Sequence, residues 1–334
     1  MHARPYLGKW RGRLENGRVK WGIIGTAWIA KERLIPAINA AENSELLAIA
    51  SRSEEKAKDF AKTYSIPRTY TSYEGLLQDP NVDAVYIPLP NHLHKEWTIR
   101  AAEAGKHILC EKPAALSVKE IEEMVFSCCQ NKVVFMEAFA FRFHPEWRRL
   151  RQIVDSGQIG DLRTVQIRFS ISVENSDDIR LNPSLGGGVL YDIGSYCING
   201  IRYIMGNEPL EVQAFADFDD NNVDVSVVSS MRFPGGRLAQ FACTFQSDYN
   251  QSLEISGTEG IIRVNFPFRH PQIMIQKNGK EEKKVFQDPV NAYVSQVEHI
   301  SNCILMGKSP SYSPEESIAN LKVIQSVYNY LKQQ

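Results

Sequence analysis

The feature that most constrains this chain is a regular alternation of short apolar strands with helical stretches. The first strand covers residues 19–24, a glycine-containing turn follows it, and a helical pattern runs from Trp28 to Ala40. This pattern is the start of a βαβ unit. Further strands are predicted at 45–51, 68–70, 84–88, 107–110 and 133–137, with helical patterns between most of them. The alternation predicts a doubly wound parallel sheet with helices on both faces.

After about residue 140 the pattern changes, because strands follow one another directly. They are predicted at 162–172, 210–218, 223–233, 237–246 and 253–255. Turn signals at 234–236, 257–260 and 277–280 indicate hairpins, and helices are expected at 144–156, 189–205, 293–306 and 314–332. This half of the chain therefore has an α+β pattern with a largely antiparallel sheet flanked by helices.

Charge and composition exclude several function classes. The chain has 38 basic and 39 acidic residues and a net charge of -1, so no strong field attracts nucleic acid or an anionic membrane. It contains no apolar run near the roughly 18 residues that span a bilayer, and no secretory signal, so we expect a cytoplasmic protein. Its six cysteines show no metal-ligand spacing and are expected to be reduced, mostly packed thiols. We expect no metal site.

The turn after the first strand has the position and composition of a phosphate-binding turn. Backbone N–H groups at the start of a helix can bind the pyrophosphate of a dinucleotide. The turn consists of Gly25, Thr26, Ala27, Trp28, Ile29 and Ala30. Ala27 replaces the glycine that permits the closest approach of the backbone, whereas alanine is accepted at position 30. The alternative interpretation is a tight turn of the kind found in any α/β protein.

The end of the second strand indicates which dinucleotide binds. An acidic residue there would hold the ribose 2′-hydroxyl of NAD, but the sequence has Ser51 and Arg52 instead. Hydroxyl and guanidinium groups suit a 2′-phosphate, which favours NADP and leaves NAD as the alternative. Glu54 and Glu55 are expected in the first turn of the next helix, where acidic residues favour its dipole.

A third segment follows the strand at 84–88, so it also lies at the carboxyl edge of the sheet, where ligands bind in this fold class. We expect it to contact the nicotinamide side of the cofactor. Its candidate contact residues are Pro88, Leu89, Pro90, Asn91 and His94. Asn91 can equally cap a helix that begins at His92.

Glu111-Lys112-Pro113 ends the next strand and places a lysine at the same edge, where Pro113 keeps it out of helical geometry. A lysine here can donate to a substrate oxygen whose charge develops during hydride transfer. The alternative is an ordinary solvated surface lysine.

Three glycines, Gly186 to Gly188, lead into a predicted helix that carries Asp192 and Tyr196. Residues four apart on a helix share one face. A tyrosine near a cationic lysine can act as an acid or a base, because the positive charge lowers its pKa. The alternative is a core tyrosine whose hydroxyl is satisfied within the protein.

Taken together, these segments resemble the glucose-fructose oxidoreductase / inositol dehydrogenase / MocA (Gfo/Idh/MocA) family from about residue 19 to the C-terminus. The resemblance rests on the first turn, on Glu111-Lys112-Pro113, and on the three glycines with Asp192. The runs 136–139, 142–145 and 180–183 look closest to the branch with dimeric dihydrodiol dehydrogenase and NADP-dependent D-xylose dehydrogenase. Tyr196 stands where many other members have a histidine.

Residues 1–18 are rich in basic side chains and are expected to be an N-terminal extension, to which we assign no function. The resemblance implies an NAD(P)-binding Rossmann domain at 19–138 and a substrate-binding domain at 139–334. It implies that a sugar or cyclic polyol is reversibly oxidised, and that the second domain's sheet joins subunits into a homodimer or homotetramer. Lys112 would then be the catalytic lysine and Tyr196 the proton donor or acceptor.

The remaining site residues are expected around this pair. Asp192 would orient Lys112 or a sugar hydroxyl. Substrate contacts are expected from Arg142, Asp178, Arg180, Asn182 and Tyr196. The aromatic side chains of Phe139, Phe141, Phe143 and Trp147 provide either an apolar wall for the substrate or part of the core. Rival hypotheses are a non-catalytic protein that senses a dinucleotide on the same fold and a purely structural oligomer.

Overall fold

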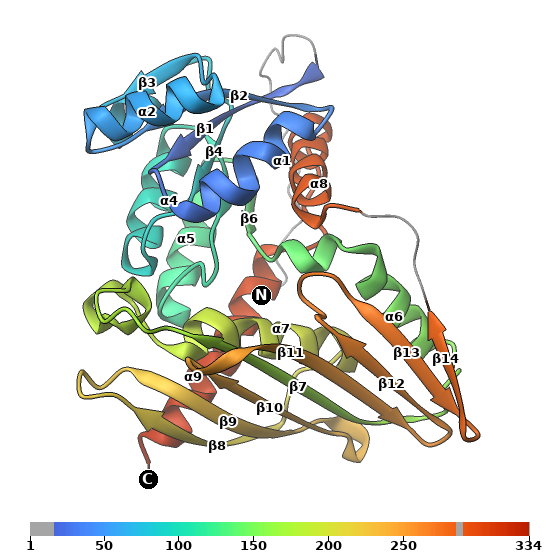
Figure 1. The fold of residues 1–334 in the computed structure, drawn as a ribbon. Coiled ribbons are helices and arrows are strands. Elements are labelled where there is room, and N and C mark those ends of the chain that lie inside the picture. Colours follow the sequence, from blue (N-terminus) through green and yellow to red (C-terminus); the bar gives the residue numbers. More distant parts are fainter. Residues whose placement is uncertain (1–16, 285–289, 334) are drawn as a thin grey trace. The chain divides into compact units, whose positions relative to one another are not determined.

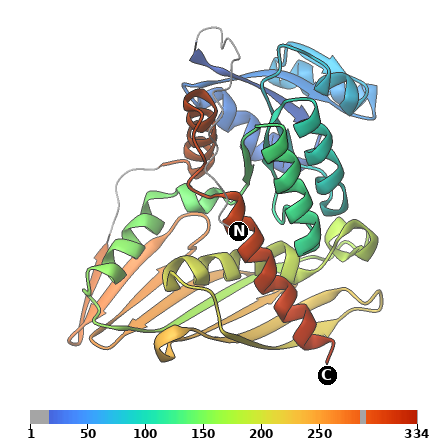
Figure 2. The same cartoon turned by 180° about the vertical axis from the view of Figure 1, so that it is seen from behind.

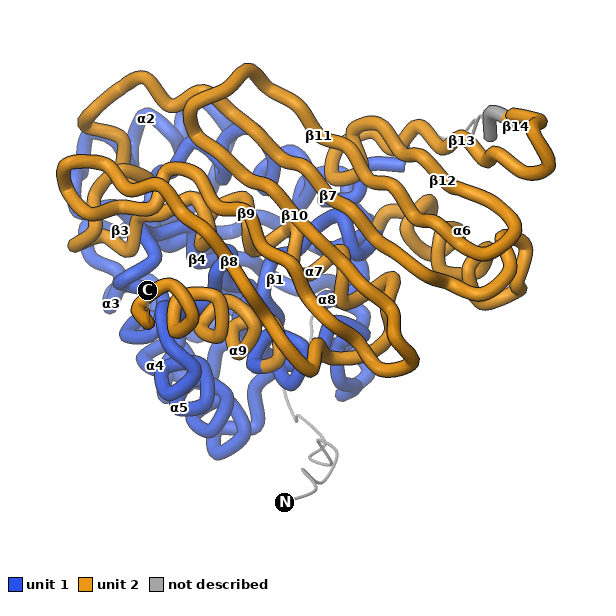
Figure 3. Tube along the Cα trace, turned by 90° about the horizontal axis from the view of Figure 1, so that it is seen from below, with its two compact units in different colours: residues 1–143, 290–318 blue, residues 144–289, 319–334 orange. Residues whose placement is uncertain are grey.

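The computed structural model describes residues 17–284 and 290–333 (Figure 1). The chain forms two compact units (Figure 3). Unit 1 comprises Met1–Phe143 and Val290–Ile318, and unit 2 comprises His144–Pro289 and Ala319–Gln334. Of the predicted N-terminal extension, residues 1–16 lie outside the described part of the chain.

Unit 1 is built on a six-stranded sheet in the order β3-β2-β1-β4-β5-β6. Every neighbouring pair is parallel, as predicted, and the order is that of dinucleotide-binding folds. The strands are β1 (Val19–Ile24), β2 (Ser44–Ala50), β3 (Arg68–Tyr70), β4 (Ala84–Ile87), β5 (His107–Cys110) and β6 (Phe135–Glu137). Strands β4, β5 and β6 are buried along their whole length, which explains why they are continuous apolar runs.

Three helices of unit 1 begin at a serine that caps them. Ser53, Ser72 and Ser117 each accept a hydrogen bond from a backbone N–H group of the helix that follows. The elements are η2 (Ala30–Leu34), α1 (Ile35–Ala40), α2 (Glu54–Tyr64), α3 (Tyr73–Leu77), η3 (Asn91–Leu93), α4 (His94–Glu103), α5 (Val118–Gln130), η4 (Ala140–Phe143) and α8 (Ala292–Met306). The predicted helix from Trp28 to Ala40 contains a π-helical turn, η2, which its sequence does not signal.

A late segment of the chain completes unit 1. Helix α8 packs against α1, β1 and β2. The Trp21 indole, which is fully buried, donates to the Ser301 hydroxyl at 3.2 Å, and that hydroxyl lies 2.9 Å from the Ser44 hydroxyl. Residues 290–318 therefore belong to the compact unit that contains the parallel sheet, although a single division of the chain after residue 138 assigns them to the second domain.

Unit 2 is built on an eight-stranded mixed sheet in the order β14-β13-β12-β11-β7-β10-β9-β8. Only β7 and β10 pair in parallel, so the predicted, largely antiparallel sheet is confirmed. The strands are β7 (Leu162–Ser172), β8 (Glu211–Phe218), β9 (Asp224–Arg232), β10 (Leu238–Thr244), β11 (Gln246–Gly257), β12 (Gly260–Asn265), β13 (Gln272–Lys277) and β14 (Lys280–Lys284).

The predicted turns join hairpins, but the fifth predicted strand was wrong in extent. Asn278 and Gly279, which join β13 to β14, both have positive φ, as a two-residue hairpin turn requires. The strand expected at 253–255 is the twelve-residue β11. Its first five residues are exposed and polar or aromatic, so they lack the apolar alternation that identifies a half-buried strand.

The helices of unit 2 include α6 (Pro145–Asp155) and α7 (Ser195–Met205), and Figure 2 shows them from behind. Helix α7 packs on β7 and β10. Helix α9 (Pro314–Leu331) begins in unit 1 and continues into unit 2, where the Asn320 amide donates to the Ser195 carbonyl of α7 at 3.4 Å. Within the described ranges, no helix has both the length and the apolar character needed to cross a bilayer.

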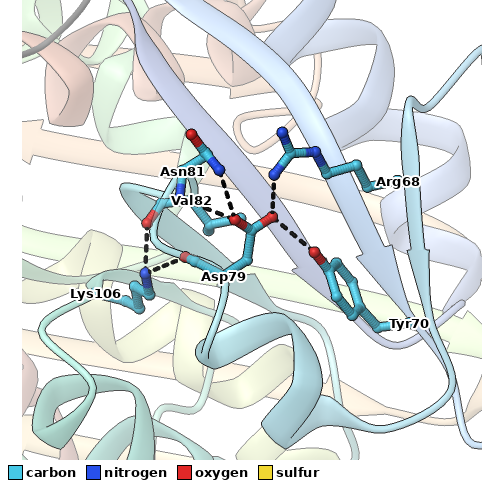
Figure 4. A network of polar contacts seen from close by, with 6 residues as sticks. All are labelled: Arg68, Tyr70, Asp79, Asn81, Val82 and Lys106. Carbon is cyan, nitrogen blue, oxygen red and sulfur yellow. Dashed lines mark hydrogen bonds and ion pairs between the residues drawn. The ribbon is translucent and has the colours of Figure 1, made fainter.

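A buried carboxylate fixes the connection between α3 and β4 (Figure 4). Asp79 accepts from the Arg68 guanidinium at 2.6 Å and from the Tyr70 hydroxyl at 2.7 Å. Its other oxygen accepts from the backbone and side chain of Asn81. The Lys106 ammonium donates to the Asp79 carbonyl at 2.6 Å. Burial alone would raise the pKa of the Asp79 carboxyl. The donors from Asn81, Tyr70 and Arg68 outweigh this effect and hold the pKa well below its usual range.

We therefore expect Asp79→Asn to lower the free energy of unfolding by about 2 kcal/mol at pH 7. The folded carboxyl has a lower pKa than the unfolded one, so its contribution is present above about pH 4 and is lost as the pH falls below that value. Urea unfolding at pH 7 and pH 3 measures the difference. Glu74→Gln is the control, since Glu74 forms an exposed ion pair with Arg100 and should cost less than about 0.5 kcal/mol. Equal losses at pH 7 would contradict the expectation.

Candidate functional site at the carboxyl edge of the parallel sheet

The structure brings the three predicted cofactor-binding segments of unit 1 together. The Gly25 N–H group donates to the Ala50 carbonyl at 2.8 Å, which ties the turn after β1 to the end of β2. Gly25 has φ of 110°, and a Cβ atom there would lie 3.0 Å from the Leu89 side chain, in the segment after β4. Only glycine adopts this backbone conformation readily, so the residue that opens the turn is required by its geometry.

The turn after β1 leads into a helix at Trp28, as predicted. The Ala27 carbonyl accepts from Ala30 at 3.1 Å and from Lys31 at 3.3 Å, so the first helical turn is closed here. Thr26, Ala27 and Ile29 are half-buried, and Trp28 is 64% exposed. The N–H groups at the start of a helix have no partners within the helix and are suited to a phosphate group. This part of the chain therefore fits a dinucleotide pyrophosphate.

The end of β2 presents a hydroxyl and a guanidinium, as the sequence predicted. Ser51 is buried, and its hydroxyl accepts from the Ser53 N–H group at 3.2 Å, whereas Arg52 is exposed. Glu54 lies in the first turn of α2, as expected, and forms an ion pair with Lys58 at 2.7 Å. The carboxylate closest in sequence to Arg52 is thus directed along its own helix.

The segment after β4 departs from one expectation. Asn91 does not cap a helix that begins at His92, because Asn91 itself opens the 3-10 helix η3 and α4 begins at His94. Pro90 precedes η3 with φ of -56°, and neither helix start has a side-chain cap. Pro88 and Leu89 are buried, and Pro90 and Asn91 are half-buried.

His94 lies between two of these segments. One ring nitrogen is 2.7 Å from the Leu89 carbonyl oxygen and the other is 2.8 Å from the Pro113 carbonyl oxygen. The ring is completely buried, and burial lowers its pKa to about 4. A neutral imidazole has a single N–H group, so it donates to one of the two carbonyls at a time. His94 thus connects the segment after β4 with the segment after β5.

Lys112 occupies the predicted position just beyond β5. It is half-buried, its peptide bond to Pro113 is cis, and its N–H group donates to the Glu111 carboxylate at 3.3 Å. The other oxygen of Glu111 accepts from the Tyr86 hydroxyl at 2.6 Å. Glu111, predicted to contact the cofactor, therefore also holds the backbone of Lys112.

A carboxylate that was not among the predicted site residues contacts the segment that follows Lys112. Glu137, the last residue of β6, accepts from the Ala114 N–H group at 2.8 Å and from the Tyr312 hydroxyl at 3.3 Å. Burial raises its pKa to about 7. The available signal was an acidic residue at the end of a strand that is otherwise apolar, since a buried carboxylate is costly without hydrogen-bond donors.

Arg142, Phe139, Phe141 and Phe143 lie in unit 1, whereas Trp147 lies in unit 2. The Arg142 guanidinium lies over the Tyr312 ring at 5.0 Å and 3.5 Å from the Glu316 carboxylate. Phe139 and Phe141 are at most 2% exposed, as is Trp147 in unit 2, so the core interpretation is correct for them. Phe143 is half-buried and packs against His299.

In unit 2, Gly187 and Gly188 allow close packing at the start of the predicted helix. Gly188 has φ of 131°, and a Cβ atom there would collide with Asp224. Asp224 accepts from the Leu190 N–H group at 2.7 Å and from the Tyr328 hydroxyl at 2.9 Å, and burial raises its pKa to about 6. The carboxylate thus fixes the start of the helix that carries Asp192 and Tyr196.

Asp192 lies in the π-helical turn η7 (Leu190–Gly194), which leads directly into α7. Its carboxylate accepts from the Arg180 guanidinium at 2.8 Å, and the same guanidinium contacts Asp178 at 3.0 Å. The attraction of Asp192 raises the pKa of Arg180 further above its ordinary value. Three predicted site residues therefore form one cluster, in which Asp192 is paired with Arg180. The Asn182 side chain is exposed and caps the turn at Pro183–Leu185.

Tyr196 lies at the start of α7 and is half-buried. Its ring packs edge-on against Phe169 and Phe268, with centroids 5.9 and 5.3 Å apart. Phe268 in turn stacks on Trp147. The ring is thus held by aromatic neighbours on β7 and on the loop after β12. The described residues contain no group of three or more His, Cys, Asp or Glu side chains that could bind a metal ion.

Comparisons with known proteins agree with this geometry. A family model described as an oxidoreductase family with an NAD-binding Rossmann fold matches residues 19–139, and a Gfo/Idh/MocA C-terminal domain model matches residues 147–263. A D-xylose 1-dehydrogenase (NADP(+)) of Haloferax volcanii is 34% identical over 92% of this chain and 96% of its own length. A trans-1,2-dihydrobenzene-1,2-diol dehydrogenase of Xenopus tropicalis is 30% identical over 94% of this chain and 97% of its own length.

Solved structures show the same architecture. An aldose-aldose oxidoreductase from Caulobacter crescentus, solved with glycerol, has a TM-score of 0.89 at 30% identity and covers 95% of this chain and 98% of its own. The 3-ketoreductase KijD10 from Actinomadura kijaniata, solved with NADP and TDP-benzene, has the same TM-score and identity, with coverage of 93% and 97%. The chain belongs to the Gfo/Idh/MocA family of oxidoreductases, whose N-terminal domain is an NAD-binding Rossmann fold.

Proposed function

We propose that this oxidoreductase transfers hydride between the nicotinamide of NADP and a carbon of a sugar or cyclic polyol that carries a hydroxyl or carbonyl group. Lys112 holds the substrate oxygen, and Tyr196 exchanges a proton with it. The observation that carries the proposal is the position of Lys112. Its backbone is fixed beside three segments that fit a dinucleotide, at the edge of the sheet where ligands bind in this fold.

The segments of unit 1 supply the cofactor contacts in this proposal. The start of the helix at Trp28 holds the pyrophosphate through residues 25–29, and Ser51 and Arg52 receive the 2′-phosphate. Residues 88–91 and Glu111 border the nicotinamide. His94 holds this region in place through its contacts with the Leu89 and Pro113 carbonyl oxygens. Bound NADP supplies the ring carbon that accepts or releases the hydride.

The protein supplies the proton chemistry. In the oxidation direction the substrate C–H bond breaks and its hydride passes to the nicotinamide, while the hydroxyl proton passes to the deprotonated phenol oxygen of Tyr196. Lys112 stabilises the negative charge that develops on the oxygen. In reduction both transfers run in reverse. Asp192, Asp178 and Arg180 already form one polar cluster in unit 2, and we propose that they bind further hydroxyl groups, together with Asn182 and Arg142.

The relatives support these assignments. The similar D-xylose and dihydrodiol dehydrogenases act on the two substrate classes in question, and the first is named for NADP. KijD10 has been solved with NADP and with one lysine or one tyrosine replaced. The two replaced residues are separated along that chain by the same number of residues as Lys112 and Tyr196 here.

We also propose that two or more copies associate through the outer face of the unit 2 sheet. Phe215 and Val228 lie opposite each other in the register of β8 and β9 and are 72% and 52% exposed. Leu238 of β10 is 49% exposed, and a shallow depression lined by residues of β7 to β10 adjoins it. Apolar side chains gathered on one face indicate an interaction surface. Whether the assembly is a dimer or a tetramer is left to the measurement below, and a cytoplasmic location stays the expectation from the sequence.

Replacing Lys112 by methionine should lower kcat about 100- to 1000-fold, because the developing charge on the oxygen loses its donor. NADPH binding, measured by fluorescence titration, should stay within about threefold, as methionine keeps most of the side-chain volume. Turnover is followed by nicotinamide absorbance across aldoses, inositols and dihydrodiols. Lys119→Met is the control, because the Lys119 side chain is 86% exposed. Unchanged turnover in Lys112→Met would disprove the proposed mechanism.

Arg52→Ala should weaken NADPH binding by about tenfold, the effect of losing one charge-assisted contact of roughly 1.4 kcal/mol, and should leave NADH binding nearly unchanged. Titration of both nucleotides measures the ratio. Arg148→Ala, an exposed arginine of α6, is the matched control. An equal loss for both nucleotides would show that Arg52 does not read the 2′-phosphate.

Phe215→Asp should dissociate the assembly, since it places a charge among the exposed apolar side chains of this surface. Light scattering after size exclusion should show a smaller mass than for the wild type, with the melting temperature of unit 2 lowered by only a few degrees. Phe126→Asp, at another exposed phenylalanine on α5, serves as the control. A wild-type mass for Phe215→Asp would rule out this surface as the contact.

A further inference from the structure

Two buried ionisable side chains hold opposite ends of a single peptide group. The Pro113 carbonyl oxygen is 2.8 Å from a ring nitrogen of His94, and the Ala114 N–H group donates to Glu137 at 2.8 Å. These two atoms belong to the same planar peptide unit. It begins at Pro113, the residue directly after Lys112, so a displacement of this unit is passed through Pro113 to the backbone of Lys112.

Glu137 is itself fixed on its other side. Its second oxygen accepts from the Tyr312 hydroxyl at 3.3 Å. The Tyr312 ring packs against Phe139, with centroids 5.6 Å apart, and the Arg142 guanidinium lies over it. The Glu137 side chain is therefore held between the segment that follows Lys112 and the late segment of unit 1.

Burying a carboxylate at position 137 costs free energy, because the charged group loses its hydration. The Glu137 side chain is almost completely buried, and burial raises its pKa to about 7. Replacement of buried charged groups by apolar groups of similar volume is often neutral or stabilising when the partners are removed as well. The carboxylate is thus better explained by what its two hydrogen bonds fix than by a gain in stability.

We propose that Glu137 is a positioning residue for Lys112, which holds the lysine at the carboxyl edge of the sheet through the Ala114 N–H group. This inference rests on the proposed role of Lys112. Glu111 and Tyr86 fix the amino side of Lys112, whereas Glu137 and His94 fix its carboxyl side. A displacement of about 1 Å in a catalytic group can lower turnover about 100-fold, so the backbone of Lys112 must be held from both sides.

The test compares three variants in the full-length protein. Glu137→Leu removes the acceptor at similar volume, and kcat should fall ~30- to 100-fold with KM and the Kd for NADPH within about threefold. Glu137→Gln retains an oxygen that can accept from Ala114, and kcat should recover to within about fivefold of the wild type. Tyr312→Phe removes the other donor to the same carboxylate and leaves the Ala114 bond, so kcat should change less than about threefold.

A further variant at the same position allows the test to be made even if Glu137→Leu is unstable. If Glu137→Leu does not fold, Glu137→Asp takes its place, because the shorter side chain withdraws the carboxylate from Ala114 while keeping its charge, and kcat should fall about tenfold. Wild-type kcat in the leucine or aspartate variant overturns the proposal. So does a parallel loss of kcat, NADPH binding and melting temperature in both the leucine and glutamine variants, which indicates a structural role alone.

The Lys112→Met variant distinguishes a failure of the proposed catalytic role of Lys112 from a failure of the positioning role of Glu137. If Lys112→Met is inactive and Glu137→Leu has wild-type kcat, the positioning role fails and the proposed function stands. If Lys112→Met retains wild-type turnover, the proposed role of Lys112 fails and the positioning role of Glu137 fails with it. A loss of kcat in both, with NADPH binding retained and with recovery in Glu137→Gln, supports both.

Discussion

Parallel pairing of β1, β2, β4 and β5 is the constraint on which the site of unit 1 depends. Parallel strands end at the same edge of a sheet, so segments separated by many residues in the chain become neighbours. The hydrogen bond from Gly25 to Ala50 and the two contacts of His94 are made possible by this register. The backbone of Lys112 is then held by its neighbour Glu111 and, through the two residues that follow it, by His94 and Glu137.

The sequence was sufficient to predict the order and type of most elements. Buried parallel strands are continuous apolar runs, and Gly25 and the serine N-caps mark turns and helix starts with local chemistry. The first part of β11 was missed because its exposed side chains lack alternation. The return of α8 to the parallel sheet was missed for another reason, since the contact of Trp21 with Ser301 joins residues far apart in sequence.

The residue types of the candidate site could be predicted from the sequence, but the partners of their hydrogen bonds and ion pairs could not. Lys112, Asp192 and Tyr196 were selected because their residue types suit proton and hydride chemistry. The partnership of Asp192 with Arg180 depends on the path of the loop before Gly186, which no local pattern encodes. Glu137 was read as the end of a strand and as part of the run 136–139 that supports the resemblance, but not as a site residue, since its burial and its hydrogen bonds exist only in the folded unit. The π-helical turns η2 and η7 were likewise not predicted from the sequence.

The contact of α8 with β1 and β2 has a consequence for the way this chain can be divided. A fragment that ends at residue 143 would keep the segments that we propose to bind the nucleotide, yet it would lack helix α8, whose Ser301 hydroxyl accepts from the buried Trp21 indole. The Rossmann portion is therefore not a module that gene fusion or truncation can move as one continuous piece. The complete unit requires residues 290–318 as well as residues 17–143, so the part of the chain that is synthesised first is completed by a part that is synthesised much later.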